Sequence, residues 1–109
     1  MIKLIGILSI AMLVVSGTAS AGDVAAGKEK SQTCVACHGA EGVSATAQFP
    51  TIAGQYRDYL YQSLTDYKAG NRKNPIMAGI VAALSDEDMK DLAAYYASLD
   101  GLTTINLPE

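Results

Sequence analysis

The chain contains few of the side chains from which metal sites and catalytic sites are usually built. Its 109 residues include one histidine and two cysteines. Structural zinc sites are almost always tetrahedral and take four ligands, mostly cysteine and histidine, so zinc would need carboxylates or a second subunit. No glycine-rich phosphate-binding loop is present, and 8 basic against 11 acidic residues form no general basic patch. These shortages argue against a structural zinc site and against a nucleic-acid partner.

Apolar runs are also scarce, and the main one stands at the N-terminus. Lys3 precedes an apolar stretch at residues 4–15, and the small residues ASA follow at 19–21. This order is typical of a cleaved secretory signal peptide, and the run is too short to span a bilayer comfortably. We therefore predict a signal peptide at residues 1–21, one periplasmic domain at 22–109, and no membrane span in the mature chain. An uncleaved anchor is the alternative.

The two cysteines and the histidine stand together in the sequence CVACH. A Cys-x-x-Cys-His run is the attachment signature of a c-type haem. On a helix, Cys34, Cys37 and His38 would share one face, because residues three and four apart are neighbours. The thiols can then form thioethers with the haem vinyl groups, while the imidazole approaches the iron as an axial ligand. The motif predicts one covalent haem c bound by Cys34 and Cys37, with His38 as an iron ligand.

A haem-free thiol oxidoreductase is the alternative use of the same two cysteines. A thioredoxin-like Cys-x-x-Cys follows a strand within a βαβ pattern, whereas the residues around this motif contain no β-branched run. Export also agrees with haem attachment, because free cysteines outside the cytoplasm would face an oxidising compartment. The haem interpretation is therefore favoured, and intact mass would decide between the two.

The remaining sequence predicts an all-α fold with helices around one haem. Four helices are expected, over residues 24–34, 55–69, 75–83 and 86–100. Asp23 and Ser85 can cap the first and last of them, and Gly70 and Gly101 can end the second and last. No segment has the period of a strand.

The second axial ligand can be narrowed by elimination. His38 is the only histidine, so two histidines of one chain cannot ligate the iron. Methionine is the usual partner of histidine in electron-carrying c haems, and the mature chain offers Met77 and Met89. Met89 lies on the apolar stripe of the last helix, where a methionine more often fills the core. Met77 lies in a segment punctuated by glycine and proline, residues 70–79, so we predict Met77, with Met89 as the alternative.

Three ordered segments resemble class I c-type cytochromes, in particular the small soluble bacterial cytochromes c-553. They are CVACHG at residues 34–39, FPTIAG at 49–54 and NPIM at 74–77, followed by DLAAY in the last helix. The resemblance covers nearly all of residues 22–109. It implies that Pro50 offers its backbone carbonyl to the second ring nitrogen of His38, which would orient the imidazole.

The resemblance also implies that the first and last helices cross where a small residue packs on an aromatic one. Here these residues are Gly27 and Tyr95. Family members often have an aromatic residue one turn further along the first helix, whereas this chain has Lys30. The crossing is therefore expected to be less tightly packed than in relatives.

The expected function is that of a soluble periplasmic electron carrier with one haem c, and not an enzyme. The single histidine is used by the iron, so no Ser-His-Asp or Cys-His catalytic set can form. The alternative is a haem module with a vacant or labile sixth position, with peroxidase-like or gas-sensing behaviour. The expected partners are redox proteins, a donor and an acceptor, in transient complexes. The basic residues Lys68, Arg72 and Lys73, just before Met77, are a candidate docking surface for an acidic partner.

Overall fold

The computed structural model describes residues 11–13 and 21–103, and in this part of the chain it contains five α-helices and no strand. The helices are α1 (Val24–Lys30), α2 (Gln32–His38), α3 (Arg57–Ala69), α4 (Pro75–Val81) and α5 (Asp86–Ala97). The expected all-α class is confirmed. Within the described residues, no helix has the length and apolar character needed to cross a membrane. Most of the predicted signal peptide, and residues 104–109 of the predicted domain, lie outside the described part.

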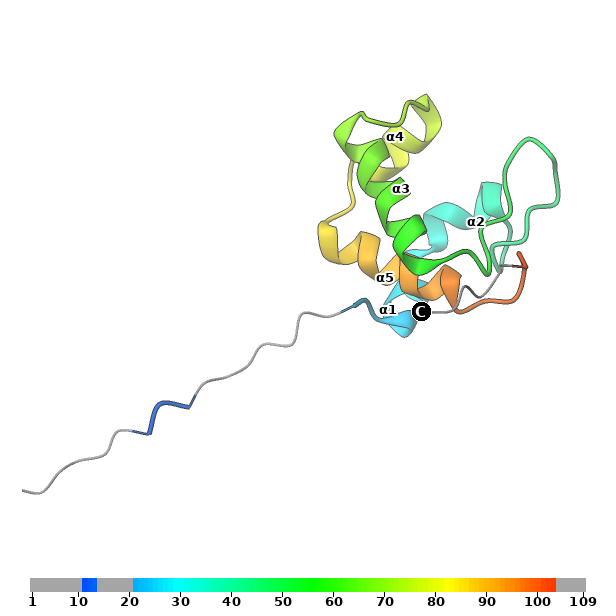
Figure 1. Cartoon of the computed structure of the whole chain (residues 1–109). Coiled ribbons are helices and arrows are strands. Elements are labelled where there is room, and N and C mark those ends of the chain that lie inside the picture. Colours follow the sequence, from blue (N-terminus) through cyan, green and yellow to red (C-terminus); the bar gives the residue numbers. More distant parts are fainter. Residues whose placement is uncertain (1–10, 14–20, 104–109) are drawn as a thin grey trace, which may run out of the picture.

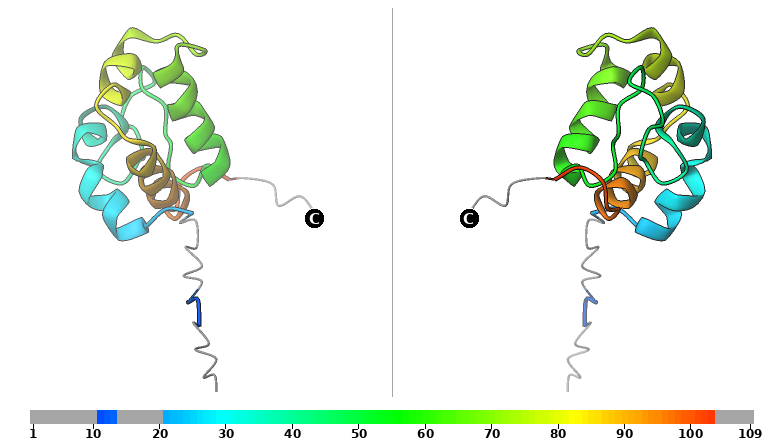
Figure 2. Two further views of the ribbon diagram at one scale, coloured as in Figure 1. Left: turned by 90° about the vertical axis from the view of Figure 1, so that its left-hand side faces the viewer. Right: turned by 90° about the vertical axis from the view of Figure 1, so that its right-hand side faces the viewer.

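The long connection between α2 and α3 lies at one side of the helices (Figure 1). In Figure 1, α3 and α4 form the upper part of the molecule, α1 and α5 lie below, and α2 stands to one side. The side views in Figure 2 show the long connection from residue 39 to residue 56 running between α2 and α3. This arrangement places the residues after the CVACH motif opposite α3 and α4, which come from the middle of the chain.

Each of the four predicted helices differs from the structure at a boundary, and the third ends at Val81, two residues earlier than predicted. The first predicted helix is two helices, because the chain turns at Ser31, whose hydroxyl donates to the carbonyl of Lys28 at 2.6 Å. The second begins at Arg57, two residues later than predicted. The last ends at Ala97, where the amide of Ser98 closes the final turn, and Gly101 lies beyond it. Gly70 ends α3 in the left-handed conformation, as predicted.

Side-chain caps explain where α1 and α5 begin. The Asp23 carboxylate accepts from the amide of Ala26 at 3.1 Å. Ser85 and Asp88 form a capping box, in which each side chain accepts from the backbone amide of the other residue, at 3.1 and 2.9 Å. Such reciprocal bonds satisfy two of the amides that a helix start leaves without partners. Asp23 and Ser85 are therefore confirmed as caps.

The crossing of α1 and α5 depends on Gly27. A Cβ atom at this residue would lie 2.0 Å from the carbonyl oxygen of Asp91 and 2.6 Å from Cβ of Tyr95. The predicted contact of Gly27 with Tyr95 is therefore confirmed, and only a glycine allows the two helices to approach this closely.

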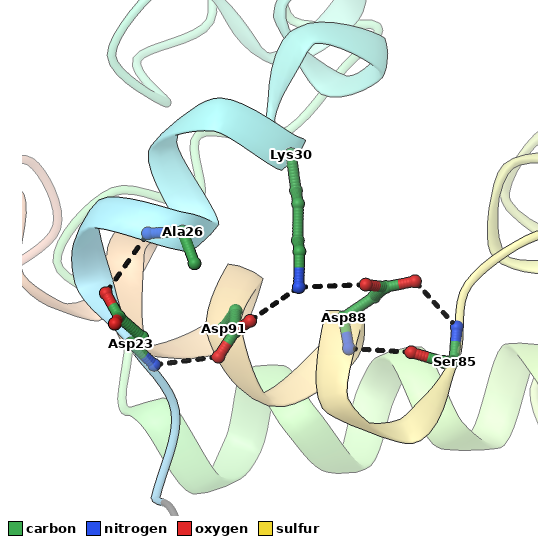
Figure 3. A network of polar contacts seen from close by, with 6 residues as sticks. All are labelled: Asp23, Ala26, Lys30, Ser85, Asp88 and Asp91. Carbon is green, nitrogen blue, oxygen red and sulfur yellow. Dashed lines mark hydrogen bonds and ion pairs between the residues drawn. The ribbon is translucent and has the colours of Figure 1, made fainter.

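Lys30 forms ion pairs between the same two helices (Figure 3). Its ammonium lies 2.6 Å from Asp91 Oδ2 and 2.9 Å from Asp88 Oδ1, and the other oxygen of Asp91 accepts from the backbone amide of Asp23 at 2.8 Å. The Asp91 side chain is only 4% exposed, so its charge needs these partners. Where relatives often have an aromatic residue, this chain has an ion-pair network between α1 and α5.

The core lies between α3 and α5. Leu92 is 2% exposed, and it packs in one cluster with Leu60 of α3 and with Ala93, Tyr95 and Tyr96 of α5. Met89 is also buried, at 4% exposure. The predicted apolar stripe of the last helix is thus buried, and it packs against α3.

Candidate functional site

The CVACH motif lies on α2, as its spacing predicts. Cys34, Cys37 and His38 are all partly exposed and line one cavity. Their positions, three and four residues apart, bring both thiols and the imidazole to the same side of the helix. Gly39 follows with φ of 87°, and its amide donates to the carbonyl of Val35 at 3.0 Å, which ends α2 directly after the histidine.

The chain after α2 returns to His38 and fixes its ring. The carbonyl oxygen of Pro50 lies 2.7 Å from Nδ1 of His38. Because a carbonyl only accepts, Nδ1 must carry the proton, and Nε2 is left as the nitrogen with a free lone pair. The loop is held by Gly42, whose carbonyl accepts from the amides of Ile52 and Ala53 at 2.8 and 3.0 Å. The contact between His38 and Pro50 that the resemblance implies is present.

Met77 reaches the same cavity from the other side. It lies in the first turn of α4, within the helix predicted over residues 75–83. The side chain of Asn74 accepts from the amides of Ile76 and Met77, at 3.0 and 3.1 Å, and Pro75 occupies the first turn. These features fix the backbone at Met77. Met77 is partly exposed and lines the cavity, whereas Met89 is buried and does not line it.

The cavity between these elements has a volume of about 500 Å³. Volumes of about 300–1,000 Å³ are typical of small-molecule and cofactor sites. Its wall is largely apolar, with side chains from the α2–α3 connection and from α3, α4 and α5, among them Ile52, Leu60, Leu64, Ile80 and Leu92. The five residues predicted for the site, Cys34, Cys37, His38, Pro50 and Met77, all line it.

The inner wall of the cavity presents neutral groups. Burial raises the pKa of the Cys34 thiol and also that of the Tyr96 hydroxyl. The Tyr96 hydroxyl oxygen is buried and has no hydrogen-bond partner among the described residues. A largely apolar inner wall of this kind suits a large apolar ligand.

Some cavity residues were not identified from the sequence. Tyr59, Ser63 and Tyr67 line the cavity from α3. They stand four residues apart, about one helical turn, so their spacing in the sequence already indicated that they share one face of the helix. Arg72, one of the basic residues of the candidate docking surface, lines it as well. Asn74 was also missed, although an Asn-Pro pair is a recognisable start of a helix.

Comparison with known proteins agrees with this geometry. The family model described as cytochrome c matches residues 24–100. Cytochrome c4 of Pseudomonas aeruginosa is 48% identical over 79 residues, which cover 72% of this chain and 39% of that protein. Cytochrome c-554(548) of Halomonas halodenitrificans is 46% identical over 81 residues, which cover 72% of this chain and 98% of that protein.

A solved structure has the same fold. The reduced recombinant cytochrome c4 from Pseudomonas stutzeri superposes with a TM-score of 0.71 at 42% sequence identity, over 74% of this chain and 47% of that one. The chain therefore spans less than half the length of these cytochrome c4 relatives. The donor set on the cavity wall consists of two thiols, one imidazole and one thioether, which is the set that a covalently attached haem with histidine and methionine ligands requires. This chain belongs to the cytochrome c family, as a class I c-type cytochrome whose cofactor is covalently bound haem c.

Proposed function

We propose that this chain is a periplasmic electron carrier with a single haem c, formed by residues 22–109 after removal of a signal peptide at 1–21. The observation that carries the proposal is that Cys34, Cys37, His38 and Met77 line one apolar cavity. Its partners are a donor and an acceptor redox protein, bound transiently.

Each of the chain's own groups has a definite role in this proposal. Cys34 and Cys37 hold the haem through two thioethers. His38 would hold the iron through Nε2, because Nδ1–H donates to the carbonyl of Pro50 at 2.7 Å. Such a hydrogen bond fixes the ring and makes the imidazole a better donor. Bound haem supplies a one-electron ferric/ferrous couple.

Met77 is the proposed second axial ligand. Its backbone is held by Asn74 at the cavity wall, while Met89 is buried in the core away from the wall. A thioether is a soft donor that favours ferrous iron and raises the reduction potential. If histidine and methionine both held the iron, no position would be open to a substrate, and the chain would transfer electrons without a catalytic site of its own. His38 is the only histidine, which leaves none for acid–base chemistry.

Two methionine variants test the ligation. In Met77→Ala we expect loss of the near-infrared sulfur-to-iron charge-transfer band of the ferric protein, and carbon monoxide binding to the ferrous protein. Met89→Ala is the matched control: it should keep the band and lose stability, by about 2–5 kcal/mol for a buried methionine. Loss of the band in Met89→Ala alone would reassign the ligand. Strong carbon monoxide binding by the unmodified protein would instead support a haem module with a labile sixth position.

Two cysteine variants test the attachment. Cys34→Ala and Cys37→Ala should each leave at most one thioether and lower the yield of holoprotein. Haem-stained denaturing gels, after expression in a strain competent for haem attachment, measure the covalent haem. Undiminished covalent haem in both variants, or a haem-free unmodified protein of unchanged intact mass, would contradict the proposal.

A further inference from the structure

Arg72 lies on the cavity wall with its guanidinium held by one face of α3. Its Nη1 lies 3.1 Å from Ser63 Oγ and 3.4 Å from Tyr59 Oη, and its guanidinium carbon lies 4.9 Å from the centre of the Tyr67 ring. The backbone is held too, because the amide of Arg72 donates to the carbonyl of Asp66 at 3.1 Å. Both the backbone and the head group are therefore placed before any ligand binds.

The charge of Arg72 has no anionic partner in the described part of the chain. The ion pairs there involve Lys30, Arg57 and Lys90, and none involves Arg72. Its contacts are two hydroxyl groups and an aromatic ring, all neutral. The hydrogen bond from Arg72, and then its positive charge, lower the pKa of the Tyr59 hydroxyl. An ordered cation without an anion, at the edge of an apolar cavity, indicates a site for a carboxylate that belongs to the ligand.

We propose that Arg72 binds one propionate carboxylate of the haem, with the Tyr59 and Ser63 hydroxyls orienting its guanidinium. The inference rests on the proposed haem function of the cavity. A haem carries two carboxylates at one edge of an otherwise apolar ring, so a cavity that accepts the ring must meet them with water or with donors. A guanidinium suits this role better than an ammonium, because its planar fork can form two parallel bonds to a carboxylate.

The neighbouring lysines do not share this geometry. Lys73 follows Arg72 in the sequence but does not line the cavity. The ammonium of Lys68 donates to the backbone carbonyl of Leu84. The basic cluster predicted from the sequence is thus divided, with Arg72 facing the cofactor site and Lys73 facing solvent.

The test compares holoproteins of Arg72→Gln, Arg72→Lys and the matched control Lys73→Gln, which removes the same charge one residue away. Covalent haem and the sulfur-to-iron band are measured first, since their absence from the unmodified protein would reject the haem function and this inference together. The propionate bending band in the low-frequency resonance Raman spectrum then reports hydrogen bonding to the carboxylate. The reduction potential reports the charge around it.

In Arg72→Gln we expect the propionate band to shift and the ferric-to-ferrous ratio at a fixed ambient potential to rise about threefold, because an unpaired carboxylate stabilises ferric haem. Arg72→Lys should keep the ratio near that of the unmodified protein, because it keeps the charge, and should still shift the band, because it loses the fork. Lys73→Gln should leave the band unchanged and move the ratio much less. An unchanged band in whichever Arg72 variant is obtained as holoprotein would overturn the inference, as would equal effects in Arg72→Gln and Lys73→Gln. In either case, a normal sulfur-to-iron band would leave the haem function standing.

Discussion

The substitution Gly27→Ala tests how closely α1 and α5 must approach. The added Cβ would lie 2.0 Å from the carbonyl oxygen of Asp91 and 2.6 Å from Cβ of Tyr95. The first of these atoms belongs to the backbone of α5 and cannot rotate away. The two helices would therefore have to separate, which would open the interface that Lys30 also bridges.

Two effects oppose each other in this variant, and their magnitudes decide the sign. Alanine is better than glycine inside a helix by about 1 kcal/mol. Overpacking a close contact costs about 1–3 kcal/mol, and the upper end applies where a backbone atom is in the way. The net expectation is a loss of about 2 kcal/mol in the free energy of unfolding, since the packing cost exceeds the gain in helix propensity. For a domain of this size, that corresponds to a fall in Tm of about 8–16 °C.

The assay is thermal unfolding of the holoprotein, followed by far-UV circular dichroism, with denaturant unfolding as a second measure. Gly79→Ala in α4 is the matched control, because no atom lies within 4 Å of the Cβ that it would add. Its expected result has the opposite sign, a gain of up to about 1 kcal/mol. A Gly27→Ala protein as stable as the unmodified one, or more stable, would refute the close packing of these helices.

Three further variants have expected outcomes. Lys30→Met should lower stability at neutral pH, and urea titrations should show the difference from the unmodified protein shrinking below about pH 4. The reason is that the backbone amide at the start of α5, and then Lys30, hold the pKa of Asp88 at about 2, so this stabilisation is present at higher pH and is lost as Asp88 is protonated. Lys73→Glu should slow oxidation by anionic ferricyanide at low ionic strength and less so above about 0.1 M salt, where the Debye length is about 10 Å; the equal charge change Lys28→Glu on α1 should have a smaller effect. Leu92→Ala should cost about 2–5 kcal/mol in denaturant unfolding, because this side chain is 2% exposed and packs between α3 and α5.

Features that depend on neighbouring residues were predictable from the sequence. Asp23 and Ser85 were identified as caps because a cap bonds to amides two or three residues away. The all-α class was predictable as well, because the helical spacing of apolar residues is also a local feature of the sequence. The break at Ser31 was not predicted, because residues 28–36 around it contain no glycine or proline to mark the end of a helix.

The role of Lys30 could not be predicted, because its ion-pair partner is far from it in the sequence. From the sequence it was only a charged residue where relatives often have an aromatic one, and a looser crossing was expected. Asp91, 61 residues away, turns it into one side of an ion pair between helices. No local pattern predicts that pairing, because it exists only once Gly27 has let α1 lie against α5.

The sequence by itself determined that the cofactor is covalent haem c, because CVACH places two thiols and an imidazole within one helical turn and a half. It also reduced the second axial ligand to two candidates. Only the tertiary structure decided that Met77 lies on the cavity wall and Met89 in the core, and that Arg72 faces the cavity. The physical reason is that attachment is a property of five consecutive residues, whereas the opposite wall is formed by α3 and α4, whose distance from α2 is set by the packing of α3 on α5.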